Sequence, residues 1–94
     1  MNNNDKIRQR GYAARRILED AEVMEAFGEI EADLLTKWAA TNPDRSDDRE
    51  AIYRQVKALD LFQQQLEAWR NNLLHLEASL AQSKRDQTGL GAEA

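Results

Sequence analysis

The sequence contains no cysteine, which excludes disulfide bonds, thiol nucleophiles and thiolate metal ligands together. It also lacks a long uncharged apolar run, so no segment is expected to span a membrane. Residues 1–5, MNNND, do not have the apolar core of a signal peptide. These absences predict a protein of the cytosol, or a component of an assembly that is built there.

Residues that break helices are scarce. The only proline, Pro43, lies in the run of turn-forming residues 41–46, TNPDRS, which is the one clear loop. Gly28 lies inside a predicted helix, where it costs about 1 kcal/mol relative to alanine. Gly89 and Gly91 lie close to the C-terminus. The sequence shows no strand pattern, so the predicted fold class is all-α.

The first half of the chain has the periodicity of a helix from about residue 6 to residue 41, with Asn4 or Asp5 as the N-cap. Glu19 and Asp20 can end one helix and begin another, so this helix is either continuous or kinked or broken near 19–21. The apolar positions that recur every three or four residues are Ile7, Ala14, Ile17, Ala21, Met24, Phe27, Ile30, Leu34 and Trp38.

The second half predicts a helix over about 47–83, with Ser46 as its N-cap. Along it, apolar residues alternate at steps of three and four, which is the spacing of the a and d positions of a coiled coil. We expect them to form one dry helix-packing seam. Its members are Leu59, Phe62, Leu66, Trp69, Leu73, Leu76 and Leu80.

A short loop between two long helices predicts an antiparallel helical hairpin, with residues 1–83 as a single domain and 84–94 as a flexible C-terminal tail. A two-helix hairpin cannot bury all of its apolar residues by itself. The residues outside the main seam are Leu35, Ala39, Val56, Leu61 and Leu74. This surplus predicts self-association into a homo-oligomeric helical bundle.

The net charge of −4 hides an asymmetry along the chain. Residues 1–16 carry five bases and one acid, a balance of +4, whereas residues 17–60 carry twelve acids and five bases, a balance of −7. We interpret Arg8, Tyr12, Arg15 and Arg16 as a contact surface for an acidic protein, nucleic acid or a phosphate ligand. The competing interpretation is a solvated helix start that pairs with the acidic stretch of its own or a neighbouring chain.

Catalytic signatures are missing from the sequence. There is no phosphate-cradling loop, no dinucleotide fingerprint and no nucleophile with a partner base. The only histidine is His75, and Asn72 stands where a metal-binding Glu-x-x-His motif would need glutamate. We therefore expect no enzymatic activity, no cofactor and no metal site.

Five segments, in this order and spacing, resemble a group of small, uncharacterised, all-helical phage and prophage proteins, which are often encoded near DNA-packaging and head-assembly genes. The segments are RGYAARRILED at 10–20, EAF at 25–27, EADLLTKW at 31–38, DREAIY at 48–53 and VKALD at 56–60. The likeness extends over about residues 7–80. It implies a phage origin and offers no catalytic residues.

The resemblance and the helical pattern together suggest a non-enzymatic phage protein that self-associates and acts in virion morphogenesis, head–tail connection or DNA packaging. The expected location is the host cytoplasm or the virion. The alternative is an anti-defence protein that binds a host immune protein or sequesters a nucleotide signal. Expected partners are further copies of the chain and other phage or host proteins. Nucleic acid or nucleotide remains open, and a membrane is not expected.

Overall fold

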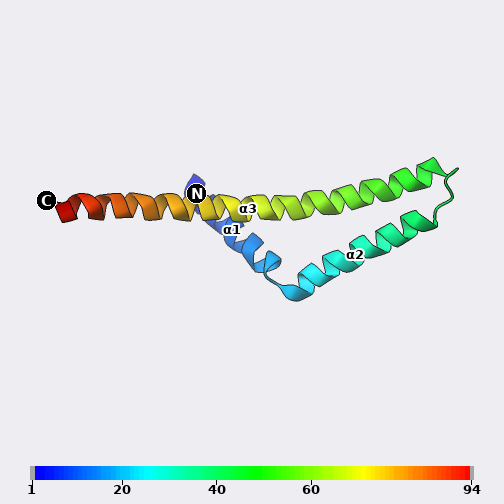
Figure 1. The fold of residues 1–94 in the computed structure, drawn as a ribbon, viewed down its shortest axis with the longest axis horizontal. Helices are drawn as coiled ribbons and strands as arrows, with labels where there is room; N and C mark the ends of the chain where they lie inside the picture. The colour runs from blue at the N-terminus through cyan, green and yellow to red at the C-terminus, as the bar shows by residue number, and fades with distance from the viewer. Residues whose placement is uncertain (1, 94) are drawn as a thin grey trace.

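The computed structural model describes residues 2–93 and the side chains of residues 2–87. Within that range the chain is all-helical, as predicted. It forms α1 (Asn3–Leu18), α2 (Ala21–Ala40) and α3 (Ser46–Glu93). The molecule is elongated, with extents of 75 × 27 × 24 Å. Helix α3 spans its whole length, α1 crosses α3, and α2 lies to one side of α3 (Figure 1).

The chain is broken between α1 and α2 at the predicted place, so the alternative of one continuous helix is wrong. Asp20 adopts an extended backbone, and its Oδ1 accepts hydrogen bonds from the N–H of Glu22 at 3.0 Å and of Val23 at 3.2 Å. This side chain satisfies N–H groups that have no partner at the start of a helix. It therefore stabilises a new helix start, and α1 and α2 can point in different directions.

The N-terminal cap differs from the prediction. Asn2 caps α1, with its Oδ1 accepting a hydrogen bond from the N–H of Asp5 at 2.8 Å. The predicted caps, Asn4 and Asp5, instead lie in the first turn. At the other junction, Ser46 is the first residue of α3 rather than its cap.

Helix α3 continues to Glu93, well past the predicted end at residue 83. Side-chain pairs one turn apart support this continuation. Gln82 donates to Asp86 at 2.9 Å, and Arg85 donates to Gln82 at 2.8 Å. The segment predicted as a tail is thus helical up to Glu93, and Ala94 lies outside the described residues.

The tightest packing in the molecule is where α1 crosses α3. Gly11 of α1 faces Leu73 of α3 so closely that a Cβ built on Gly11 would overlap the Cβ of Leu73 and lie 2.8 Å from its Cδ2. Only glycine permits this separation of the two helices. Ala14, one turn further along α1, is fully buried, as is Leu73. Small residues on α1 therefore let Leu73 fill the space between the helices.

The predicted seam of α3 is buried only in part. Leu66 and Leu73 belong to the core, as expected. Phe62 and Leu80, however, are 54% and 46% exposed, so the prediction of one continuous dry seam is wrong at these positions. These side chains are exposed because α1 and α2 cover only part of α3. Figure 1 shows α2 diverging from α3 and the C-terminal part of α3 extending past the start of α1.

Helix α2 contacts α3 through aromatic side chains. The rings of Phe27 and Phe62 lie 5.8 Å apart at a tilt of 30°, a separation typical of favourable aromatic pairs. Leu34 is the buried residue of α2. Across the loop, the Arg49 guanidinium lies 4.5 Å from the ring centre of Trp38, and its Nε donates to Thr41 Oγ1 at 2.9 Å. These contacts attach the end of α2 to the beginning of α3.

The helix crossing predicts opposite effects for one substitution at two glycines. Gly28 has no atom within 4 Å of a built Cβ, so Gly28→Ala should stabilise the protein by up to about 1 kcal/mol through helix propensity. Gly11→Ala gains the same propensity, but overpacking against Leu73 costs about 1–3 kcal/mol. Thermal melting followed by circular dichroism should therefore show a higher midpoint for Gly28→Ala and a lower one for Gly11→Ala. Equal increases would contradict the close crossing.

Two adjacent leucines of α3 test which side of this helix is buried. Leu73 is fully buried, whereas Leu74 is 47% exposed. Leu73→Asp buries an unpaired carboxylate, which costs several kcal/mol and approaches the stability of a small domain. We expect Leu73→Asp to lose helicity at 25 °C and Leu74→Asp to keep it. A cooperative, unchanged melt for Leu73→Asp would disprove the burial.

Candidate functional site

The predicted contact surface on α1 is divided by ion pairs. Arg8 pairs with Asp5 of its own helix at 3.3 Å. Arg15 reaches α3, where its Nη2 lies 3.1 Å from Glu77 Oε1, and its guanidinium is 5.7 Å from the ring centre of Tyr12. The structure therefore brings Tyr12 and Arg15 together and gives Arg8 a separate partner.

Arg16, the fourth predicted residue of this surface, is exposed and forms no ion pair within the described part of the chain. Arg15 agrees in part with the competing interpretation, in which the basic end pairs with acids, because Arg15 pairs with an acid of its own chain. That acid is Glu77, which lies outside the acidic stretch that was expected to neutralise the basic end.

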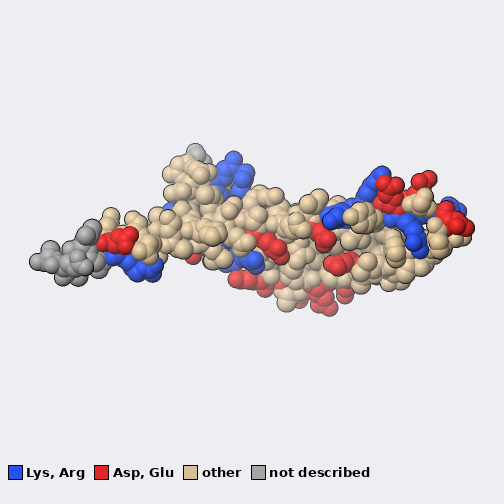
Figure 2. All heavy atoms as spheres, turned by 45° about the horizontal axis from the view of Figure 1, so that its top comes forward, with Lys and Arg blue, Asp and Glu red and all other residues tan. Residues whose placement is uncertain are grey.

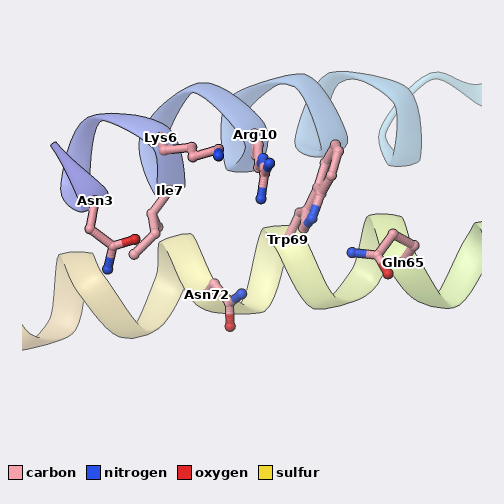
Figure 3. A pocket seen from close by; sticks show the side chains of 7 residues that line it. All are labelled: Asn3, Lys6, Ile7, Arg10, Gln65, Trp69 and Asn72. Carbon is pink, nitrogen blue, oxygen red and sulfur yellow. The ribbon is translucent and has the colours of Figure 1, made fainter. Parts of the chain in front are cut away.

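A groove between α1 and α3, which we call the basic groove, was not anticipated from the sequence. It has a volume of about 250 Å³. Arg10 lies over Trp69, with 5.0 Å between the guanidinium carbon and the ring centre. Figure 3 shows Lys6 and Arg10 side by side on α1, with the Trp69 side chain rising from α3 beside Arg10 and with Gln65 and Asn72 on α3 below. The lining residues are Asn3, Lys6, Ile7, Arg10, Gln65, Trp69 and Asn72.

One feature of the sequence is consistent with this groove. Lys6 and Arg10 are four residues apart, a spacing that places both on one face of a helix. The predicted contact surface included Arg8 and Arg15 but not Arg10. The structure places Arg10 over Trp69.

A second groove, which we call the apolar groove, lies between α2 and α3 near the loop. Its volume is about 310 Å³, and its lining residues are Leu35, Trp38, Tyr53 and Val56. Leu35 and Tyr53 are 52% and 56% exposed. Leu35 and Val56 belong to the apolar surplus that was predicted to remain outside the main seam.

Charged side chains are distributed unevenly over the surface. In Figure 2, Lys and Arg gather beside the projecting start of α1, Asp and Glu gather along the lower edge of the view, and both kinds are mixed near the α2–α3 loop. Glu31, Asp60 and Glu67 line a shallow acidic hollow between α2 and α3. Within residues 2–93, no three acidic, histidine or cysteine side chains are grouped as a metal site. No helix in the same range is long and apolar enough to cross a membrane.

Comparisons with protein-family models, with curated proteins and with solved structures find no match to this chain. The resemblance to phage proteins and every function that follows from it therefore stay predictions.

The ion pair between α1 and α3 gives a test of their relative position. Arg15→Glu places a like charge beside Glu77 and should destabilise the fold, while adding Glu77→Arg should restore the attraction with reversed polarity. Both side chains are partly exposed, so the coupling should be about 0.2–1 kcal/mol. Urea denaturation of the four proteins in this double-mutant cycle measures it. A coupling of zero would show that the two charges do not meet in solution.

Proposed function

We propose that this chain is a non-enzymatic assembly protein that acts through self-association. Following the resemblance of its sequence, we place it in phage virion morphogenesis, head–tail connection or DNA packaging, with the host cytoplasm or the virion as its location. The apolar groove is the observation that carries the proposal. It presents aromatic and aliphatic side chains from two helices at the surface of a molecule with a small core.

The balance between buried and exposed apolar residues supports self-association. The buried apolar side chains are Ala14, Leu34, Leu66 and Leu73. The large apolar residues that remain exposed are Tyr12, Ile30, Leu35, Trp38, Tyr53, Leu61, Phe62, Leu74 and Leu80. A chain of this size depends on efficient burial for its stability, and exposed apolar patches commonly mark interaction sites. A second copy that covers part of this surface would add the burial that one chain lacks.

The expected interface extends beyond the apolar groove. Full burial of an aromatic side chain removes about 150–250 Å² from water, and Trp38 and Tyr53 are already partly covered. The groove alone therefore falls short of the roughly 800 Å² per partner of a standard interface. Leu74 is exposed and lies about five helical turns from Val56 on the same face of α3, so it adds area when the second copy lies along this face.

In the assembled state we propose that α2 and α3 form the antiparallel hairpin of a homo-oligomeric helical bundle. The loop between Ala40 and Ser46 is short, a feature typical of antiparallel neighbours. Phe62, which is half exposed in one chain, lies at a seam position of the heptad pattern and would become buried between copies. The proposal gives the chain no catalytic step.

Sedimentation velocity tests self-association directly. The wild-type protein at micromolar concentration should sediment as a species heavier than the 10.8 kDa chain. The double variant Leu35→Lys/Tyr53→Lys places two like charges in the apolar groove. It should raise the dissociation constant of self-association by at least about tenfold and so favour the monomer. Both residues are exposed in the single chain, so helicity should remain.

Ala26→Lys serves as the matched control, because Ala26 is an exposed residue of α2 that does not line the apolar groove. It should associate as the wild type does. A wild-type monomer with cooperative melting would disprove the proposal, and so would equal weakening by the control and the groove variant.

A further inference from the structure

The basic groove contains two cations that no carboxylate neutralises. On α1, Arg8 is paired with Asp5 and Arg15 with Glu77. Lys6 and Arg10 form no ion pair with any described residue, and no Asp or Glu lines the groove. The neighbouring arginines are thus paired with carboxylates, whereas Lys6 and Arg10 leave a positive charge where α1 faces α3. Such a site favours an anionic ligand.

Arg10 is held in a geometry that suits a phosphate. Its guanidinium carbon lies 5.0 Å from the centre of the Trp69 ring, within the range of a cation–π contact. The N–H donors of a guanidinium lie in its plane and remain available at the edge. Two of them can bind two oxygens of one phosphate. Contact with Trp69 also restricts the side chain and reduces the entropy lost on binding.

The remaining polar lining suits a nucleotide better than a simple anion. Gln65 and Asn72 of α3 and Asn3 of α1 carry amides that both donate and accept hydrogen bonds, as the edges of nucleobases do. Trp69 is partly exposed in this groove, and an indole can contact a base or sugar. One end of the groove, at Asn3, lies in the first turn of α1, where the helix dipole favours negative charge.

We propose that the basic groove binds one nucleotide unit, with Lys6 and Arg10 holding its phosphate and with Trp69 and the amides contacting its base or sugar. The volume of about 250 Å³ is slightly below the roughly 300–1,000 Å³ of small-molecule sites, so we expect the groove to hold one such unit. The nucleotide unit can belong to a free nucleotide or to a nucleic-acid strand. The inference goes beyond self-association, because none of the residues that line the basic groove lines the apolar groove.

Isothermal titration of the wild-type protein with ADP, adenosine and an oligothymidylate tests this inference. ADP or the oligothymidylate should bind saturably, and adenosine, which lacks phosphate, should bind at least about tenfold more weakly than ADP. Saturable ADP binding identifies a free nucleotide as the ligand. Binding of the oligothymidylate alone identifies the strand. Either result supports binding in the groove only when substitution of Lys6 or Arg10 weakens it and substitution of Arg8 does not.

Lys6→Ala and Arg10→Ala should each weaken the binding by at least about tenfold, because each removes a charge-assisted contact. Arg8→Ala is the matched control. It removes the same charge from the same helix, but Arg8 is paired with Asp5 and does not line the groove, so affinity should be unchanged. Arg10→Lys keeps the charge and loses the planar fork, so its affinity should lie between those of the wild type and Arg10→Ala. Circular dichroism confirms that each variant is folded.

Three results would overturn the inference. The first is the absence of binding by both phosphate-containing probes. The second is equal weakening by Arg8→Ala and Lys6→Ala, which would show general attraction to the basic end of the molecule. The third is displacement of the bound nucleotide or oligothymidylate by polyglutamate at a similar concentration, which would show a site for acidic protein. Lys6 is exposed, so its variant remains informative even where loss of Arg10 from Trp69 disturbs the fold.

Discussion

The contact between Gly11 and Leu73 determines where α1 lies, and the rest of the tertiary structure depends on it. Because Gly11 has no Cβ, α1 approaches α3 closely enough for Leu73 to be fully enclosed. The same crossing places Arg10 over Trp69 and Arg15 beside Glu77. A wider crossing would lose the packing around Leu73, and it would also separate the two walls of the basic groove. Core packing and the candidate ligand site therefore rest on one glycine.

The break at Asp20 is the second requirement for this arrangement. A continuous helix through residues 19–21 would carry α1 along the direction of α2, which diverges from α3 (Figure 1). With Asp20 capping a new helix, α1 can turn back and cross α3. The polar side chain of one residue thus decides whether the apolar residues of α1 meet those of α3 at all. Local capping and long-range packing are coupled at this point of the chain.

The sequence predicted the features that depend on local chemistry or on helical periodicity. These are the helical class, the break near Asp20, the loop around Pro43 and the burial of Leu66 and Leu73. It did not predict the features that depend on contacts between distant residues. From sequence alone, a glycine in a helix carries only an unfavourable propensity, and nothing near Gly11 indicates that Leu73 will lie against it. The pairing of Arg10 with Trp69 was missed for the same reason.

Helix α3 runs through 48 residues without interruption, and both grooves include residues on it. Val56 in the apolar groove and Trp69 in the basic groove are separated by about 20 Å along its axis at 1.5 Å per residue. An unbroken helix keeps that interval nearly constant, because only a sharp kink would disrupt its backbone hydrogen bonds. Copies that associate symmetrically through their apolar grooves would therefore hold their basic grooves at one set spacing. Ligand units connected at that same spacing would be bound together far more tightly than separate ones.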